Sequence, residues 1–322
     1  MNGSPKVSED SRKKIRVWSA ESYVDVGMMI ALLIILVMGL VMIYSTSSYR
    51  ANELYGDNWY FFKRQTIYML AAVCVMIAIS RYDYRMLLPV SKGILFSSMA
   101  LQILVLVMGT ASHGSARWLY IGSVGFQPSE YAKTAIIIYT AAQASMRSRE
   151  LARPSVLLKV MALPLITIVL IGVENLSTAI ICFAILFIVL FVGSPTVRHF
   201  VIIGLCGIAG GGLFIAFAGY RANRVKIWLA PEKYDDGYQT IQSLYAVGSG
   251  GLFGRGLGNS VQKMGFIPES HNDMIFSVIC EELGIVGAVF VIVLFLVLLC
   301  RMALIAMNSR DRFGGLLVSG VM

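Results

Sequence analysis

Charged residues are scarce in this sequence. Only 14% of its 322 residues are Asp, Glu, Lys or Arg, whereas 57% are hydrophobic. A typical soluble domain has about 25% charged and about 45–50% apolar residues. The composition therefore excludes a disordered chain and an ordinary cytosolic enzyme. It also leaves too little polar surface for a basic nucleic-acid-binding face, so no nucleic-acid partner is expected. The class that fits is a multi-span membrane protein.

Cysteine and histidine are scarce as well, with five and three residues. All five cysteines fall inside long apolar runs and have neither disulfide nor zinc spacing, so we interpret them as small packing residues. His113 and His199 have no second ligand at metal spacing and are predicted to be surface residues. These counts exclude a disulfide-stapled secreted scaffold, and the sequence leaves any metal ligands unknown.

Apolar runs long enough to cross a bilayer as helices are numerous. Eight such runs lie near residues 24–44, 65–80, 86–109, 130–146, 156–173, 175–193, 197–219 and 274–300. The predicted fold is an all-α polytopic membrane bundle. Its parts are a tail at 1–22, spans 1–7 within 23–219, a large loop at 220–273, span 8 at 274–300, and 301–322, where a cytoplasmic loop leads into the start of a ninth span.

The net charge of +9 lies on one side of the predicted membrane. The amino-terminal tail and the loops on its side hold 16 of the 27 cations and seven of the 18 anions. The other 11 cations and 11 anions cancel. Because cytoplasmic loops are enriched in Lys and Arg, the amino terminus is predicted to be cytoplasmic. The excess charge is therefore a signal of topology, and the balanced charges are the candidates for chemistry.

Two outward connections, 110–129 and 220–273, are longer than the others, and long loops are often functional. The second is rich in aromatic residues and is predicted to pack as a cap or re-entrant element. Its glycine run at 248–258 lacks the residues of a nucleotide-binding loop, so no nucleotide is expected. Two interpretations stay open for this run: glycine amides beside a lipid-linked or pyrophosphate substrate, or a tight re-entrant turn.

Several charged residues flank these connections. Asp273 precedes the eighth span and is either a functional carboxylate or a helix N-cap. Glu281 lies about two helical turns deeper in the bilayer, where burying a carboxylate costs free energy. Glu281 and Glu282 are either functional residues or part of a buried ion pair. Glu130 and Lys133 share one helix face. Further cations lie in the outward loops and suit an anionic lipid-linked head group, loop salt bridges or lipid phosphates; they are Arg117, Arg221, Arg224, Lys226 and Lys263.

Four motifs resemble the SEDS family (shape, elongation, division and sporulation), which includes FtsW, RodA and SpoVE. They begin with Ala116-Arg-Trp-Leu-Tyr-Ile-Gly and Phe126-Gln-Pro-Ser-Glu-Tyr-Ala-Lys133, followed by Glu174-Asn-Leu-Ser-Thr-Ala179. Then come Gly237-Tyr-Gln-Thr-Ile-Gln-Ser243 with the glycine run, and Pro268-Glu-Ser-His-Asn-Asp-Met-Ile-Phe276 with Glu281-Glu-Leu-Gly284. The run Gly256-Leu-Gly-Asn-Ser-Val-Gln-Lys263 is more similar to the division and sporulation branch. Family members have ten spans, so this chain is expected to lack the last two.

The resemblance implies a peptidoglycan glycosyltransferase that polymerises lipid II at the outer face of the bacterial cytoplasmic membrane, in septal, spore or other cell-wall synthesis. Asp273 matches the family's essential aspartate. Other matches imply substrate-binding roles for Arg117, Trp118, Glu130, Lys133 and Glu281, and we extend this role to Arg221, Arg224, Lys263 and His271. The chemistry favours a divalent cation, Mg or Mn, at the pyrophosphate. Expected partners are a class B penicillin-binding transpeptidase and other divisome or elongasome membrane proteins. A lipid II flippase and a non-catalytic scaffold are the alternatives.

Overall fold

The computed structural model describes residues 24–108, 110–112, 115–121, 124–217, 219–267 and 270–322. The tail predicted at 1–22 lies outside the described residues. All eight predicted runs form helices, as expected: α1 (Val26–Tyr55), α2 (Tyr60–Ser80), α3 (Leu87–Met108), α4 (Pro128–Met146), α5 (Pro154–Glu174), α6 (Leu176–Gly193), α7 (Arg198–Phe217) and α10 (Ile275–Met307). The start of a ninth run forms α11 (Arg312–Val321).

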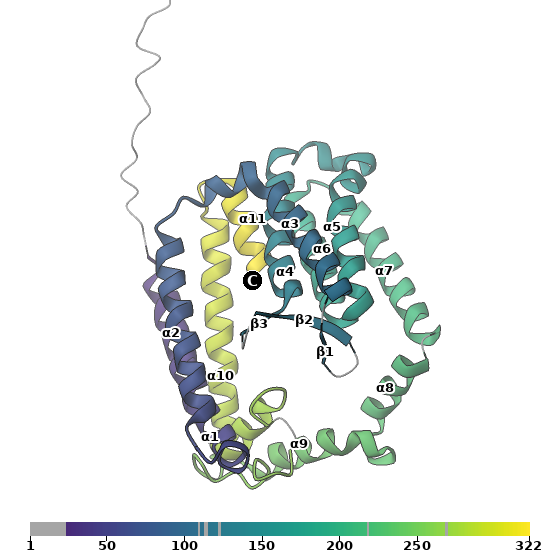
Figure 1. Cartoon of the computed structure of the whole chain (residues 1–322). Helices are drawn as coiled ribbons and strands as arrows, with labels where there is room; N and C mark the ends of the chain where they lie inside the picture. Colours follow the sequence, from purple (N-terminus) through teal and green to yellow (C-terminus); the bar gives the residue numbers. More distant parts are fainter. Residues whose placement is uncertain (1–23, 109, 113–114, 122–123, 218, 268–269) are drawn as a thin grey trace, which may run out of the picture.

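The helices form two groups (Figure 1). In one, α10 packs on α1 and on α9 (Tyr238–Ser249), and α2 packs on α1. In the other, α3, α4, α5 and α6 pack around a common core. The short helix α11 contacts α4, α6 and α10 and thereby joins the two groups. Helix α7 runs along the edge of the second group and continues into α8 (Gly219–Leu229).

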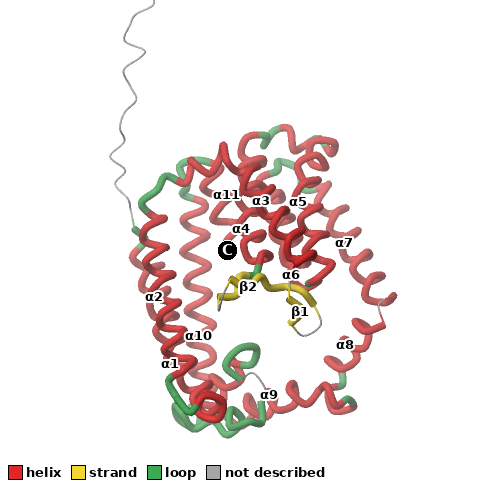
Figure 2. The backbone as a smooth tube through the Cα atoms, in the orientation of Figure 1, coloured by secondary structure: helices red, strands yellow, loops and turns green. Residues whose placement is uncertain are grey.

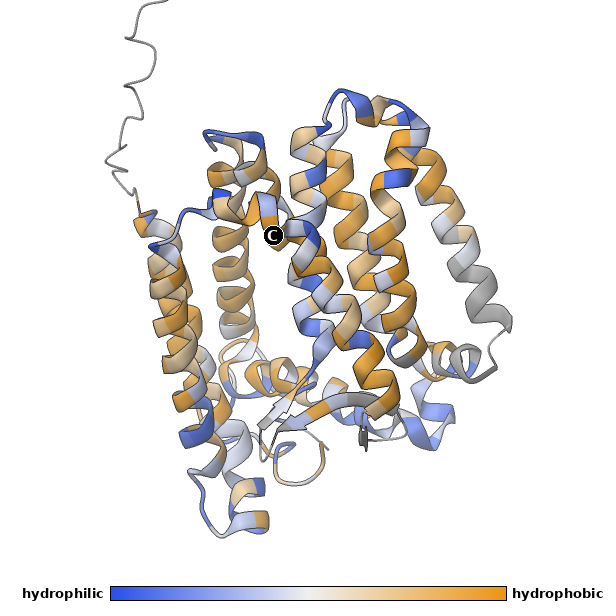
Figure 3. Cartoon of the chain, turned by 45° about the horizontal axis from the view of Figure 1, so that its top comes forward, coloured by the Kyte–Doolittle hydropathy of each residue, from blue (hydrophilic) through white to orange (hydrophobic). Residues whose placement is uncertain are grey.

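Within the described residues, six helical segments are long and apolar enough to cross a membrane: those that form α1, α2, α3 with its preceding turn, α5, α6 and α10. Figure 3 shows that apolar residues cover these helices and that polar residues gather at their ends. Helix α4 is less apolar than these six. Most of its residues contact protein, so it does not need an apolar surface toward lipid. Its segment from Ala135 to Ala144 is buried throughout, so it is the central helix of its group.

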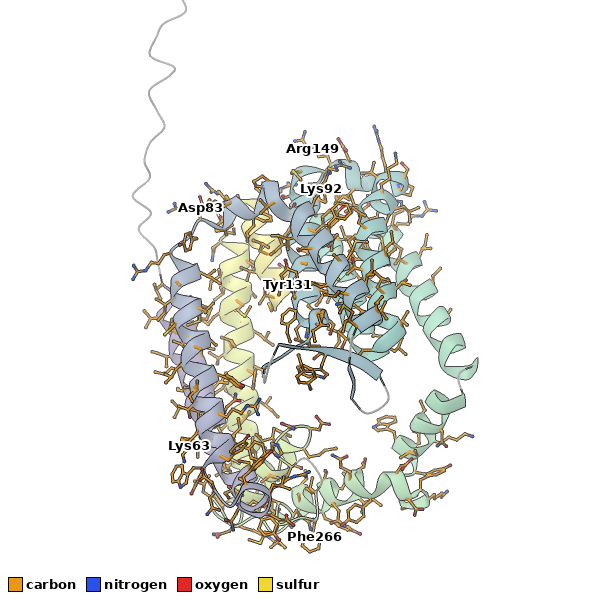
Figure 4. The ribbon with its side chains drawn as sticks, in the orientation of Figure 1. Lys63, Asp83, Lys92, Tyr131, Arg149 and Phe266 are labelled. Carbon is orange, nitrogen blue, oxygen red and sulfur yellow. The ribbon has the colours of Figure 1, made fainter. Side chains whose placement is uncertain are left out.

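Charged residues of the connections lie at both ends of the bundle. Figure 4 places Asp83, Lys92 and Arg149 at the end where α1 begins, and Lys63 and Phe266 at the opposite end. Helix α1 begins at that first end with Asp25, whose carboxylate caps the helix by accepting from the Met28 amide at 2.8 Å. The same carboxylate receives two bonds from Arg301 of α10, at 2.6 and 3.0 Å, which fixes the two helices together.

A three-stranded antiparallel sheet follows α3, where the sequence predicted only a loop. It consists of β1 (Thr110–Ser112), β2 (Ser115–Ile121) and β3 (Val124–Phe126), with Leu119 opposite Phe126. The sheet lies beneath α4 and α6 (Figure 2). Its segments are short but rich in aromatic and β-branched residues, which favour strands. The all-α bundle is thus confirmed, with this small sheet as an addition.

The large connection at 220–273 is mostly helical or turn, in agreement with the prediction that it packs. It contains α8, two short 3-10 turns, η4 (Pro231–Lys233) and η5 (Asp235–Gly237), and then α9. Helix α9 lies on α10 and on η4. The remaining described residues, 250–267 and 270–274, fold as successive turns over the ends of α1 and α10.

At the other end of the bundle, hydrogen bonds to Asp311 connect the α10–α11 turn to η2 (Tyr84–Met86). Asp311 accepts from the Tyr84 hydroxyl at 2.6 Å, from Arg85 Nε at 3.0 Å and from the Gly314 amide at 2.8 Å. Partial burial would raise the pKa of the Asp311 carboxyl, but these hydrogen bonds outweigh it and hold the pKa below its usual range. The folded state therefore favours the carboxylate, and this stabilisation is lost as pH falls through the lowered pKa.

Arg85→Gln is expected to lower the free energy of unfolding only slightly at neutral pH, because the ion pair is partly exposed. The difference from the unsubstituted protein should shrink as pH falls below the ordinary carboxyl pKa of 3.8. Thermal denaturation in detergent at several pH values measures both. Arg81→Gln, at an exposed arginine of the same connection, is the matched control. A pH-independent difference would contradict this role for Asp311.

Candidate active site

Asp273 lies at the surface, in a turn that leads into α10. The helix begins at Ile275, and its N-cap is Met274, whose side chain makes no capping bond. Asp273 is therefore not the N-cap, which removes one of the two interpretations of this residue. Its side chain is exposed, and among the described residues its carboxylate has no hydrogen-bond or ion-pair partner. A carboxylate in this setting is available to a ligand.

The turn that holds Asp273 is anchored on the two neighbouring helices. Ser270 is buried and its hydroxyl donates to the carbonyl of Thr46 in α1 at 3.2 Å. The His271 ring lies against the ring of Phe61 in α2, with centroids 4.8 Å apart. His271, predicted to bind substrate, thus packs against α2, and Asp273 extends from a turn fixed on two sides.

Helix α10 is broken at Gly284, where φ is 68° and ψ is −169°. In an unbroken helix the amides of residues 285 and 286 would donate to the carbonyls of residues 281 and 282. The segment 251–256 supplies the missing partners instead. The four bonds run from Arg255 N to Glu281 O at 2.9 Å, from Gly256 N to Glu282 O at 3.0 Å, from Ile285 N to Gly251 O at 3.0 Å, and from Val286 N to Leu252 O at 3.2 Å.

This exchange decides between the two interpretations of the glycine run in favour of the tight turn. The glycines bring the backbone of the segment directly against α10, and no side chain fits between them. A Cβ atom at Gly254 would overlap the carbonyl of Glu282, and one at Gly284 would overlap the backbone of Leu252. The run therefore joins the large loop to α10, and the amides of Arg255 and Gly256 and the carbonyls of Gly251 and Leu252 bond to the helix at its break.

Glu281 and Glu282 lie one turn before the break, and both side chains are completely buried. Glu281 accepts from the Ser260 hydroxyl at 2.5 Å and from two successive amides, those of Val261 at 3.1 Å and Gln262 at 3.3 Å. The guanidinium of Arg255 lies 3.4 Å from the same carboxylate. Glu281 thus fixes the start of the turn at 260–263.

Glu282 forms a second buried cluster with Lys263 and Ser45. The Lys263 ammonium lies 2.7 Å from the Glu282 carboxylate, 2.7 Å from the Gly258 carbonyl and 3.0 Å from the Ser45 hydroxyl. Its side chain is 4% exposed. The Ser45 hydroxyl lies 2.7 Å from both Glu282 oxygens. Two carboxylates thus face two cations, as buried ion pairs require.

The burial of Lys263 and Glu281 does not fit the substrate contact predicted for them. Glu281 fits the buried ion-pair interpretation, and Lys263 fits the loop salt-bridge interpretation, that the sequence also allowed. Ser45 was missed as a partner because it lies 237 residues from Glu282. The signal in the sequence is the polar run Ser45-Thr-Ser-Ser48, which interrupts an otherwise apolar helix.

A second set of predicted residues lies on the other helix group. Lys133 pairs with Glu130 at 2.7 Å in the first turns of α4, and the two side chains are 29% and 56% exposed. Trp118 is half-buried in β2, a strand that contacts α4. Helix α4 packs on α3, α6 and α11, whereas α10 packs on α1, α9 and α11. The Glu130–Lys133 pair and Asp273 are therefore carried by different groups.

Three predicted cations cannot be placed in the site. Arg117 belongs to strand β2, and Arg221 and Arg224 belong to α8, but their side chains lie outside the described part of the structure. The described residues also contain no group of three His, Cys, Asp or Glu side chains close enough to hold a metal ion. The buried carboxylates already have cationic and hydrogen-bonding partners, so the described side chains alone do not form a metal site.

Comparison with known proteins places the chain in a family. The FtsW/RodA/SpoVE family model, described as "Cell cycle protein", matches residues 26–322. Stage V sporulation protein E of Bacillus subtilis is 33% identical over 307 residues, 92% of this chain and 83% of that protein. The probable peptidoglycan glycosyltransferase FtsW of Geobacter sulfurreducens is 33% identical over 289 residues, 88% of this chain and 78% of that protein.

Two solved structures share the fold. A chain of a peptidoglycan synthase complex that coordinates polymerization and crosslinking has a TM-score of 0.73 at 24% identity, covering 91% of this chain and 81% of that chain. The rod shape determining protein RodA of Thermus thermophilus has a TM-score of 0.66 at 24% identity, covering 94% and 81%. The sequence match extends over nearly the whole chain at more than 30% identity, and this chain belongs to the FtsW/RodA/SpoVE family of cell cycle proteins.

Proposed function

We propose that the chain is a peptidoglycan glycosyltransferase that polymerises lipid II into glycan strands at the outer face of the bacterial cytoplasmic membrane, with its amino terminus in the cytoplasm. The observation that carries the proposal is the exposed carboxylate of Asp273 on an anchored turn, where no other described residue forms a hydrogen bond or ion pair with it. Asp273 precedes the start of α10, and this start lies at the end of the bundle opposite to the one that bears Lys92 and Arg149 (Figures 1 and 4). This placement agrees with an extracytoplasmic site.

The reaction is a displacement at the anomeric carbon of a lipid-linked donor. The 4-hydroxyl of an acceptor N-acetylglucosamine attacks that carbon, and the bond to undecaprenyl pyrophosphate breaks with inversion of configuration. Asp273 takes the hydroxyl proton as general base. The pyrophosphate leaves as an anion and needs no general acid, so one carboxylate is sufficient.

The leaving group must be neutralised as its charge develops. We assign this role to Lys133 of the Glu130–Lys133 pair together with Arg117, Arg221 and Arg224, and we assign Trp118 to packing against the substrate. Mg²⁺ is usually held by one or two carboxylates plus substrate phosphates. A divalent cation is therefore proposed to enter with the pyrophosphate, where it would supply charge neutralisation.

A class B penicillin-binding transpeptidase is the proposed partner, alongside other divisome or elongasome membrane proteins. The support is the structural similarity to a chain of a complex whose description joins polymerization to crosslinking. A glycan strand made at the outer face must be crosslinked there. A complex of polymerase and transpeptidase would place the two reactions side by side.

Reconstitution in vesicles tests the function. The purified chain, with its transpeptidase, is supplied with lipid II that is already on the outer side, and glycan products are separated by gel electrophoresis. We expect polymer. Translocation of lipid II without polymer would instead support a flippase. Neither polymer nor translocation, with the complex intact, would support a scaffold.

A further inference from the structure

We propose that Ser45, Lys263 and Glu282 are positioning residues that hold the turn of Asp273 in its reactive place, and that they do not bind substrate. The proposal rests on the proposed glycosyltransferase function. It concerns a cluster that joins three separate parts of the chain: α1, the turn at 258–263 and the first half of α10.

The hydrogen-bonding capacity of Lys263 is already used within the protein. An ammonium group has three N–H donors, and Lys263 has three acceptors: the Ser45 hydroxyl, the Gly258 carbonyl and the Glu282 carboxylate. With a side chain only 4% exposed, it has no donor left for a pyrophosphate. Glu282 is likewise occupied by Lys263, by the Ser45 hydroxyl and by the Ser260 amide at 3.4 Å.

The first half of α10 is separated from the rest of the helix by a break in the helical backbone. The break at Gly284 separates residues 275–283 from the long apolar half of the helix. The first half is held by two backbone bonds, from Arg255 N to Glu281 O and from Gly256 N to Glu282 O, and by the two buried carboxylates at its inner end. The orientation of this half-helix therefore depends on the partners of Glu281 and Glu282.

Helix α1 anchors the half-helix and the turn before it through two adjacent residues. Ser45 binds Glu282 at the inner end of the half-helix, and its neighbour Thr46 accepts from Ser270 in the turn that carries Asp273. Asp273 lies between these two anchors in sequence, three residues from Ser270 and nine from Glu282. Loss of the inner anchor should therefore tilt the half-helix and displace the carboxylate of Asp273.

The double variant Lys263→Met with Glu282→Gln tests the proposal. It removes both charges of the pair, keeps the side-chain volumes and leaves no unpaired buried charge. A displacement of about 1 Å at a reacting group can lower a rate by about 100-fold. We expect kcat for lipid II polymerisation to fall by about this factor while KM for lipid II stays within about twofold.

The control is Asn52→Leu. Asn52 lies on the same helix, α1, and lines a cavity of about 480 Å³ that is also bounded by Ser45 and Lys263. If substrate were bound beside Lys263, Asn52→Leu and the double variant would both raise KM, and the proposal would be overturned. Unchanged kcat and KM in the double variant would overturn it as well, because the cluster would then be merely structural.

Folding is checked by thermal stability in detergent and by co-purification of the transpeptidase. If the double variant does not fold, Ser45→Ala removes one bond to Glu282 and leaves both charges in place. It should lower kcat about threefold to tenfold without raising KM, and an unchanged kcat would contradict the proposal. An inactive unsubstituted protein would refute the proposed function itself, which makes the two failures distinguishable.

Discussion

Asp273→Asn is expected to abolish polymerisation of lipid II while the folded complex persists. The asparagine side chain has nearly the same shape but cannot take the proton of the acceptor hydroxyl. General base catalysis contributes about 10²- to 10⁴-fold, so the product should fall to or below the limit of a gel assay. Stability should not change, because the Asp273 carboxylate makes no hydrogen bond or ion pair with any described residue and does not cap α10.

The matched control for this experiment is Asp236→Asn. Asp236 is another exposed carboxylate of the same large connection, in η5, and it should retain full activity. Thermal stability and co-purification of the transpeptidase should match the unsubstituted protein for both variants. Polymer from Asp273→Asn at more than about a tenth of the normal rate would exclude Asp273 as the base. Loss of the complex together with activity would point to a structural role instead.

The helices were predictable because their signal is local. A run of about 20 apolar residues has few alternatives to a buried or membrane helix, and each of the eight predicted runs became one. The small sheet was not predictable in the same way. Strand β2 is seven residues long and its partners have three each, so no apolar period extends far enough to distinguish these segments from a loop.

The site was only partly predictable, because some of its contacts join residues that are far apart in the sequence. Asp273 stood out by its place before an apolar run, and Glu130 and Lys133 by their helical spacing. The roles of Lys263 and Glu281 depend on partners that are distant in sequence. The sequence shows that a charged residue lies near the membrane, but whether a neighbour such as Ser45 already satisfies it depends on the tertiary fold.

A second large effect is expected for Gly250→Ala, a substitution in the glycine run. Gly250 has ordinary helical dihedral angles, with φ of −73° and ψ of −26°, so backbone strain does not enter. The added Cβ would overlap the carbonyl oxygen of Cys280 and lie 3.0 Å from the Cα of Glu281. Both are backbone atoms of α10, so they cannot rotate away as a flexible side chain would.

Gly250→Ala is therefore expected to separate the glycine segment from α10 and to lower the free energy of unfolding by about 3 kcal/mol, the upper end for overpacking. Gly248→Ala is the matched control, since nothing lies within 4 Å of its Cβ. It lies in the last turn of α9, where alanine should be neutral or stabilise by up to about 1 kcal/mol. Thermal denaturation of both variants in detergent measures the difference.

Activity adds a second, independent test of the same contact. Because the segment makes four backbone bonds with α10 at its break, Gly250→Ala should also reduce polymerisation in proportion to the fraction of protein that unfolds. Any additional loss would reflect a displaced Asp273. Equal stability of the Gly250→Ala and Gly248→Ala proteins would contradict the close packing of the glycine run on α10. It would also make the pyrophosphate-contact interpretation of that run the better one, because an alanine accepted at Gly250 requires open space where α10 lies.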